Sequence, residues 1–207
     1  MITRRHALIA TAATAGLAAL ALGGPGGEAR AQDGAVADIT LGDPSAPVKV
    51  VEYASYTCPH CADFHQATFP AFKRDYIDTG KVHFTYREVY FDRYGLWASM
   101  IARCAGPDRY FGVAELLYQR QGEWARQADP AQVAESLKRI GAQAGLSPEQ
   151  ADACLQDAEM AQALVSWYEG NAERDGVRST PSFLIDGEMH SGAMSLEQIG
   201  SLVDAQM

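Results

Sequence analysis

The chain has 207 residues, of which 47% are hydrophobic and 21% charged, and its formal net charge is −9. These proportions are ordinary for a globular protein and exclude a disordered chain, a collagen-like repeat and a protein with several membrane spans. The acidic balance argues against nucleic acid as a partner, because neutralising phosphates requires a basic surface. Four cysteines are too few for a small disulfide-dense scaffold, so the fold must depend on a hydrophobic core.

Residues 1–31 have the three parts of a secretory signal peptide. Arg4 and Arg5 precede a long stretch without formal charge, and a small-x-small sequence ends at Ala31. We therefore predict cleavage after Ala31 and export to a bacterial periplasm, where disulfides persist. The arginine pair is also typical of a twin-arginine signal. An ordinary secretory signal fits equally well, and a retained membrane anchor is the remaining alternative.

The first part of the remaining chain predicts a strand–helix–strand unit. Alternating, β-branched and aromatic runs predict strands at 38–41, 48–53 and 82–89. A helix is expected from 58 to about 79, kinked or split at Pro70 and ended by Gly80. A strand, a helix and a strand of these lengths form a βαβ unit with parallel strands.

Alanine-rich helical sequence then extends from about residue 93 to 175. Asp129-Pro130 and Ser147-Pro148 mark two helix starts, each with a capping side chain followed by proline at the first helical position.

Strand signals return in the last part of the chain. Strands are predicted at 182–185 and 188–191, around the turn signal Asp186-Gly187. A capping box at Ser195 then opens a final helix. The outline is therefore βαβ, a helical block, and ββα.

Cys58 and Cys61 form a CxxC motif at the start of the first predicted helix. Free backbone N–H groups at a helix N-terminus favour a thiolate at Cys58, and the thiolate is the attacking species in disulfide exchange. Pro59 is compatible with a first helical turn, and His60 is expected to donate a hydrogen bond or partial positive charge to the Cys58 sulfur. Both effects would make the disulfide a stronger oxidant.

A CxxC motif alone also fits half of a zinc site or a structural disulfide. Zinc normally requires a second pair at ligand spacing, and Cys104 and Cys154 form no such pair, so we expect no metal. A CxxC that follows a strand and opens a helix in a βαβ unit is typical of a thioredoxin-like redox site. Thr180-Pro181 precedes a later strand, where the thioredoxin superfamily carries a cis-proline, and we expect a cis bond there.

From Gly42 to the C-terminus, the sequence resembles the DsbA-like family of thiol:disulfide oxidoreductases in the thioredoxin superfamily. The resemblance rests on a Gly-Asp-Pro-x-Ala-Pro lead-in, a strand ending in Glu52-Tyr53, the Cys-Pro-His-Cys motif and the interrupting helical block. It implies an α/β thioredoxin fold with an all-helical insertion. The thioredoxin-like domain would comprise 32–91 and 177–207, and the insertion 92–176.

The resemblance also implies an activity. Such an enzyme donates the Cys58–Cys61 disulfide to reduced, newly exported proteins through a mixed disulfide at Cys58. It acts as a monomer, needs no metal or organic cofactor, and is reoxidised by a DsbB-like membrane oxidase. Thr180 and Pro181 are expected to pair with the client backbone. Thr180 stands where the best-known member has valine, which leaves the redox strength open.

Three further residue predictions follow. Glu52 matches the family's buried acid, which shuttles protons for Cys61; the alternative is a strand residue facing solvent. Cys104 and Cys154 are expected to form a structural disulfide, as in some relatives, rather than remain two buried thiols. His65 is interpreted as a surface helix residue.

Two other functions stay open. The first is a reductase or isomerase on the same fold, although isomerases need a separate dimerisation domain, for which there is no room between Gln32 and Val48. The second is a metal carrier, for instance for copper, that uses Cys58, Cys61 and a histidine.

Overall fold

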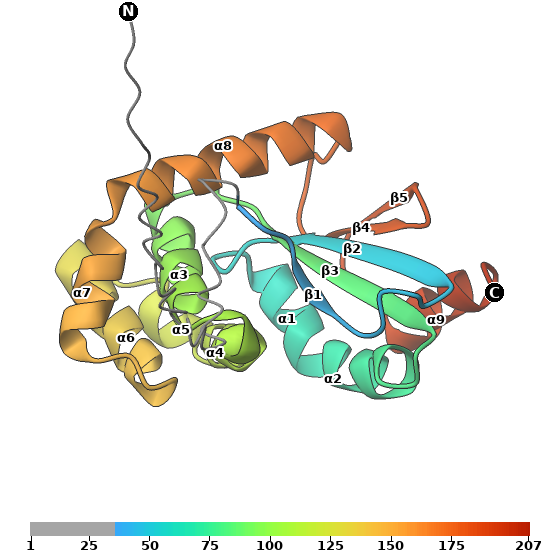
Figure 1. The fold of residues 1–207 in the computed structure, drawn as a ribbon, viewed down its shortest axis with the longest axis horizontal. Coiled ribbons are helices and arrows are strands. Elements are labelled where there is room, and N and C mark those ends of the chain that lie inside the picture. The colour runs from blue at the N-terminus through green and yellow to red at the C-terminus, as the bar shows by residue number, and fades with distance from the viewer. Residues whose placement is uncertain (1–35) are drawn as a thin grey trace, which may run out of the picture. The chain divides into compact units, whose positions relative to one another are not determined.

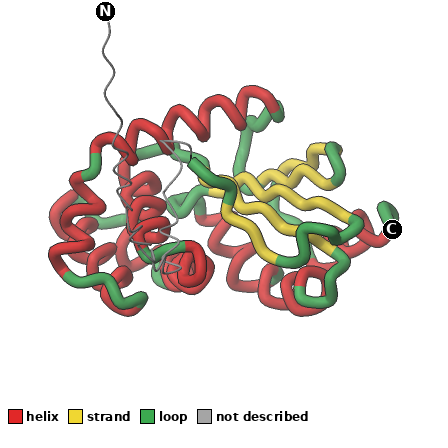
Figure 2. The backbone as a smooth tube through the Cα atoms, in the orientation of Figure 1, coloured by secondary structure: helices red, strands yellow, loops and turns green. Residues whose placement is uncertain are grey.

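The computed structural model describes residues 36–207, so the predicted signal peptide and its cleavage site at Ala31 lie outside the described residues. Within that range one five-stranded sheet, whose strands are yellow in Figure 2, has the order β1-β3-β2-β4-β5. Its strands are β1 (Ile39–Leu41), β2 (Val48–Ala54), β3 (Val82–Glu88), β4 (Ser182–Ile185) and β5 (Glu188–Ser191). β2 and β3 are parallel and the other neighbouring pairs are antiparallel (Figure 1). Each strand lies within one residue of its predicted bounds.

The first helical stretch is split where proline predicts a break. It comprises α1 (Pro59–Ala67), α2 (Phe69–Phe72) and a π-helical turn, η1 (Lys73–Ile77). Pro70 lies in the first turn of α2, where its missing N–H costs no hydrogen bond. The π-turn was not predicted, and it is closed by the Asp78 N–H donating to the Lys73 carbonyl at 2.8 Å.

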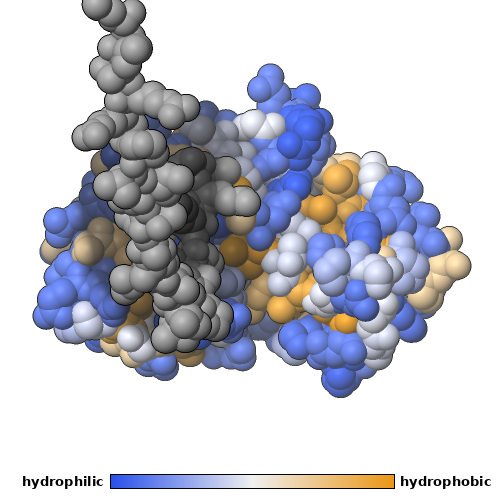
Figure 3. All heavy atoms as spheres, viewed as in Figure 1, coloured by the Kyte–Doolittle hydropathy of each residue, from blue (hydrophilic) through white to orange (hydrophobic). Residues whose placement is uncertain are grey.

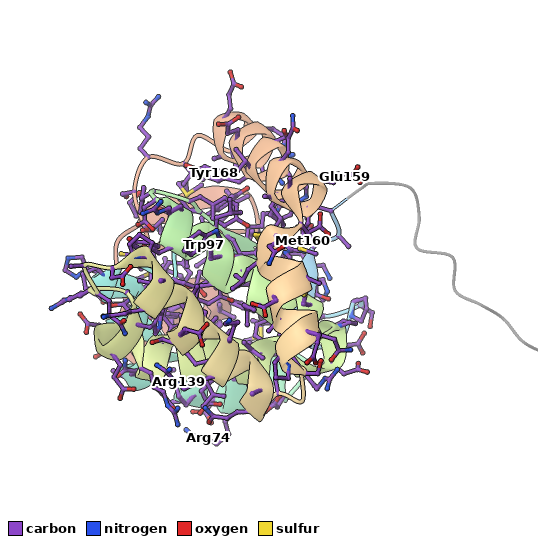
Figure 4. The ribbon with its side chains drawn as sticks, turned by 90° about the vertical axis from the view of Figure 1, so that its left-hand side faces the viewer. Arg74, Trp97, Arg139, Glu159, Met160 and Tyr168 are labelled. Carbon is purple, nitrogen blue, oxygen red and sulfur yellow. A yellow bond between two sulfur atoms is a disulfide. The ribbon has the colours of Figure 1, made fainter. Side chains whose placement is uncertain are left out.

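Six helices lie between β3 and β4, as the alanine-rich sequence predicts. They are α3 (Arg93–Cys104), α4 (Pro107–Gln119), α5 (Gln121–Trp124), α6 (Pro130–Gln143), α7 (Pro148–Gln156) and α8 (Ala158–Arg174). Asp129 caps α6, and Ser147 forms the predicted capping box on α7. Asp157, which was not predicted as a cap, accepts from the Met160 N–H and starts α8. Figure 4 shows the outer face of this helical segment, with Arg139 on α6 and Met160 on α8.

Helices cover both faces of the sheet, as Figure 1 shows. α1, α2 and the final helix α9 (Leu196–Asp204) lie on one side, and α2 packs against α9. On the other side, the Tyr53 hydroxyl on β2 donates to the Asn171 carbonyl of α8 at 3.3 Å. β2 is therefore a central strand buried on both faces, which decides the environment of any charged residue it carries.

One hydrophobic cluster joins the sheet to the helical segment. It includes Val50 on β2, Phe84 on β3, Ile101 on α3 and Leu117 on α4. A buried ion pair crosses the same boundary, because Arg103 on α3 donates to both carboxylate oxygens of Glu88 on β3 at 2.7 Å. The helices therefore share the core of the sheet rather than pack only on one another. Among residues 36–207, no helix is both long and apolar enough to span a membrane.

Candidate redox site

The two cysteines of the CxxC motif lie where β2 passes into α1. Cys58 is the N-cap residue of α1 and has an extended backbone, and Cys61 lies in the first turn of that helix. Cys58 is 9% exposed and Cys61 is fully buried. Both are free thiols, so the structure is that of the reduced protein. An attacking group from solvent can reach Cys58 but not Cys61.

The two sulfurs have opposite ionisation behaviour. Several contacts lower the pKa of Cys58 to about 5, against the opposing effect of burial. The largest contribution is the hydrogen bond from the Cys61 thiol, followed by the Thr180 side chain and the backbone N–H groups of Cys61 and His60. The pKa of Cys61 is strongly raised, chiefly by burial and then by the hydrogen bond to Cys58 and the charge of Glu52. In the reduced form at neutral pH, Cys58 is therefore a thiolate and Cys61 a thiol.

The Thr180–Pro181 segment faces this pair. Its peptide bond is cis, and β4 begins directly after it. The Cys58 thiol donates to the Thr180 carbonyl at 3.5 Å. The Thr180 hydroxyl is buried and finds no partner among the described residues while Cys58 is a thiol. A Cys58 thiolate would accept a hydrogen bond from that hydroxyl, which accounts for the effect of Thr180 on the pKa.

Of the two residues between the cysteines, Pro59 lies as predicted, whereas His60 does not make the expected side-chain contact. Pro59 occupies the first helical position, as predicted. The His60 imidazole points away into solvent, and its Nδ1 lies 3.9 Å from an Asp63 carboxylate oxygen. The expected donation from the imidazole to the Cys58 sulfur is therefore wrong for this structure. The backbone N–H of His60 provides the stabilisation instead.

Glu52 lies in the middle of β2 and is fully buried, so the alternative of a solvent-facing residue is wrong. Its strand neighbours are Tyr86 on β3 and Phe183 on β4. Even spacing places Glu52 on the same face as Val50 and Ala54, and its contact with His65 of α1 shows that this face is turned toward that helix. From there its charge raises the pKa of the Cys61 thiol.

The interpretation of His65 as a surface residue is wrong. His65 is buried on α1, and its Nε2 lies 3.1 Å and 3.0 Å from the two carboxylate oxygens of Glu52. A sequence signal was available, because residues four apart share one face of a helix and Cys61 was expected to be buried. His65 follows Cys61 by four residues and therefore faces the sheet with it.

The helical segment supports the cysteine loop through two side chains that sequence reasoning missed. The Gln121 amide on α5 donates to the carbonyls of Tyr56 and Cys58, each at 2.8 Å. Asp92, which caps α3, accepts from the Thr57 hydroxyl at 2.8 Å. No local pattern links these residues to the motif, because the contacts arise only when the insertion packs on the sheet.

The remaining two cysteines lie away from this site. Cys104 on α3 and Cys154 on α7 form a disulfide. Within the described residues, no group of three or more His, Cys, Asp or Glu side chains is arranged to hold a metal ion.

Comparisons with known proteins fit this geometry. The family model described as thioredoxin matches residues 35–205. A Rickettsia typhi protein, provisionally named a protein-disulfide oxidoreductase, is 35% identical over 168 residues, which cover 81% of this chain and 61% of that protein. The Bacillus subtilis disulfide bond formation protein D is 25% identical over 175 residues, covering 81% of this chain and 76% of that protein.

Solved structures agree. Wolbachia pipientis α-DsbA1 superposes with a TM-score of 0.74 at 29% identity, covering 82% of this chain and 90% of the other. The comparisons confirm the predicted thioredoxin fold with its helical insertion and the resemblance to DsbA-like proteins. The chain spans about three fifths of the length of the Rickettsia relatives.

Proposed function

The chain belongs to the thioredoxin family, and from this premise we propose that it is a protein-disulfide oxidoreductase that donates its Cys58–Cys61 disulfide to reduced client proteins. The names of the Rickettsia and Bacillus relatives support this reaction class. The direction, from enzyme disulfide to client, is supported by the chemistry of the two sulfurs.

The observation that carries the proposal is the contrast between Cys58 and Cys61. The thiolate of Cys58, with a pKa of about 5, exists only in the reduced protein. Whatever stabilises that thiolate lowers the free energy of the reduced form relative to the disulfide, so the disulfide gives up its bond more readily. A CxxC pair with this asymmetry is suited to oxidising its partners.

The proposed reaction has two exchange steps. A client thiolate attacks the Cys58 sulfur, the Cys58–Cys61 bond breaks, and its electron pair goes to Cys61, which takes up one proton. A second client thiolate then attacks the client sulfur of the mixed disulfide, and Cys58 leaves as a thiolate. The client loses two electrons and the enzyme gains them. The low pKa of Cys58 makes it a good leaving group in the second step.

Client binding is proposed at the segment that faces Cys58. A client chain next to Thr180 and Pro181 would pair its backbone with this segment as an added strand. We place the reaction in the periplasm, with a DsbB-like membrane oxidase restoring the disulfide and without a metal or organic cofactor. We further propose that the protein acts as a monomer.

Trapping tests the mechanism. In a Cys61→Ala variant the mixed disulfide through Cys58 has no internal sulfur to release it, so incubation with a cysteine-containing peptide in its disulfide form should accumulate a covalent complex. A Cys58→Ala variant is the matched control and should form none. Complexes that form equally in both variants would refute attack at Cys58.

A reductase or isomerase on the same fold is the second candidate, because Thr180 precedes the cis-proline as it does in isomerase relatives. Thiol alkylation of cell extracts separates the two directions. An oxidase should be found with the Cys58–Cys61 disulfide mostly formed, whereas a pair found mostly reduced would reverse the proposed direction.

A further inference from the structure

A buried acid–imidazole pair lies directly behind the CxxC motif. Glu52 on β2 and His65 on α1 are both buried, and a single nitrogen, Nε2, lies within 3.1 Å of both carboxylate oxygens. Cys61 shares the inner face of α1 with His65, one helical turn away. The structure therefore stacks a thiol, a carboxylate and an imidazole between one helix and one strand.

The contact between Glu52 and His65 requires a proton. A carboxylate and a ring nitrogen at this separation are held by one hydrogen, carried either by Nε2 or by the acid. Among the described residues, His65 is the only hydrogen-bond partner of the Glu52 side chain. Because a buried carboxylate without a partner is costly, a hydrogen stays between the two groups, whichever of them carries it.

The groups around the imidazole do not compete for that proton. The His65 ring stacks on Tyr118 of α4, with ring centroids 4.3 Å apart, and meets Tyr86 of β3 edge-on. The two tyrosine hydroxyls bond each other at 2.6 Å, and burial raises both of their pKa values well above the ordinary value. Both hydroxyls therefore stay protonated at neutral pH.

On its other side, His65 reaches a cavity. It lines a cavity of about 670 Å³ between α1–α2 and α4, which is bounded by apolar side chains such as Phe69 and Phe111 and by the charged side chains of Lys73, Asp78 and Glu115. In Figure 3 hydrophobic side chains are exposed near the middle of the molecule, between the helical segment and the sheet. The second ring nitrogen, Nδ1, makes no hydrogen bond to a described residue. The space is large enough to hold several water molecules.

We propose that His65 is the outer member of a proton relay, which moves protons between water in this cavity and Glu52 and, through Glu52, to the sulfur of Cys61. The relay rests on the proposed disulfide exchange and adds the path by which its buried sulfur is protonated. His65 acts through Glu52 and does not touch the reacting atoms.

The relay balances each exchange step. Before the bond breaks, Glu52 is the neutral acid and Nε2 carries the ring proton, which it donates to an oxygen of that acid. When the Cys58–Cys61 bond breaks, the electron pair goes to Cys61, Glu52 gives its acid proton to that sulfur, and the Nε2 proton moves to the carboxylate that this leaves. Nδ1 then takes a proton from cavity water. The proton that the client thiol released to solvent replaces the one taken from the cavity water. On reoxidation every transfer runs backwards, so that Cys61 becomes the thiolate that attacks the Cys58 sulfur.

A route of this kind is needed because Cys61 has no direct access to solvent. Its side chain is fully buried, and burial raises its pKa far above that of a free thiol. A thiolate left there without a proton donor would be a poor leaving group and would slow the breaking of the disulfide. The His60 imidazole is exposed at the surface, beside Asp63.

Chemical rescue tests the relay. Stopped-flow reduction of the oxidised protein by dithiothreitol should be about a hundredfold slower in His65→Ala, the lower end of the effect of a lost proton-transfer group. Added imidazole, which fits the cavity extended by the substitution, should restore the rate in a saturable manner. His65→Gln, which keeps a hydrogen-bond donor but cannot relay a proton, should be equally slow.

Matched controls separate the relay from a structural role and from the proposed function. Gln66→Ala changes the wall of the same cavity and should react like the wild type, and imidazole should not rescue Glu52→Gln. A wild-type rate in His65→Gln, or a slow His65→Ala that imidazole does not accelerate, would overturn the relay. The assay reports cleavage of the Cys58–Cys61 bond by a small dithiol, so its outcome is independent of whether the protein oxidises clients.

Discussion

At the scale of single residues, Cys58 owes its thiolate character to a small set of neighbours. The largest contribution to its low pKa is the hydrogen bond from the Cys61 thiol, and the Thr180 side chain and two backbone N–H groups add to it. The position at the start of α1 supplies those N–H groups. The effect is therefore assembled from both halves of the chain.

Removal of the Cys61 thiol should raise the pKa of Cys58 well above about 5, because it deletes the largest stabilising contact. Ultraviolet absorbance of the thiolate as a function of pH measures this. Cys61→Ser is the matched control, since its hydroxyl still donates, and its pKa should lie between those of the wild type and Cys61→Ala. A Cys61→Ala titration that overlays the wild type would contradict this assignment.

Thr180→Val should also raise the pKa of Cys58, by less than Cys61→Ala does, because Thr180 ranks below the Cys61 thiol among the stabilising contacts. Valine preserves the shape and removes only the buried hydroxyl. The same titration, together with the equilibrium against glutathione, should show a less oxidising disulfide. An unchanged titration would mean that the hydroxyl does not reach the thiolate.

Sequence reasoning reached some of these residues and missed others for a definable reason. Cys58, Cys61 and Glu52 were predictable because a local motif and strand burial point to them. His65 was within reach, since it follows Cys61 by one helical turn. Gln121 was not, because its bonds to the carbonyls of Tyr56 and Cys58 join segments about sixty residues apart. Local periodicity carries no information on such contacts.

At the scale of helices and strands, the predictable features are those with a local cause. Pro70 splits the first helix, Gly80 ends it with φ +77°, and Ser147 and Ser195 form capping boxes. The π-turn at 73–77 and the break between α7 and α8 were not predicted. They depend on how these segments pack: the π-turn lies against α2 and β3, and a single Asp157 cap is a weak signal within an alanine-rich run.

The disulfide between α3 and α7 crosslinks two helices of the helical segment. Cys104 and Cys154 are separated by 50 residues, so replacing both by alanine should lower the free energy of unfolding by about 2–4 kcal/mol. Denaturant unfolding measures the loss. Because the bond lies away from Cys58, the thiolate titration should not change, and a shifted Cys58 pKa in the double variant would show that the two cysteine pairs are coupled.

At the scale of the whole molecule, the redox state and the stability of the fold are linked through one ionisation. The reduced protein carries a Cys58 whose pKa is about 5 when folded, against an ordinary 9.0 when unfolded, whereas the oxidised protein has no such group. A lowered folded pKa stabilises the reduced form fully above pH 9, and this contribution is lost as the pH falls to about 5. Cys61, whose pKa is raised, affects only the range above its ordinary value.

The free energy of unfolding of the reduced protein, relative to the oxidised one, should therefore decrease steadily as pH falls from 9 to 5 and level off below that. Denaturant unfolding of both redox forms at a series of pH values measures the difference. Cys58→Ser cannot form the disulfide and has no thiolate, so its free energy of unfolding should follow that of the oxidised wild type over this pH range, without the additional slope. A difference that does not vary with pH in the wild type would mean that the Cys58 thiolate is not specific to the folded state.

Oxidation of clients by this protein can be observed by mixing the oxidised protein with an equal amount of a reduced two-cysteine peptide at neutral pH. Mass spectrometry and thiol counting should find the peptide disulfide formed and the Cys58–Cys61 pair reduced, with Cys104–Cys154 intact. The opposite result, a peptide that stays reduced while the reduced protein opens a preformed peptide disulfide, would contradict oxidation of clients and identify a reductase.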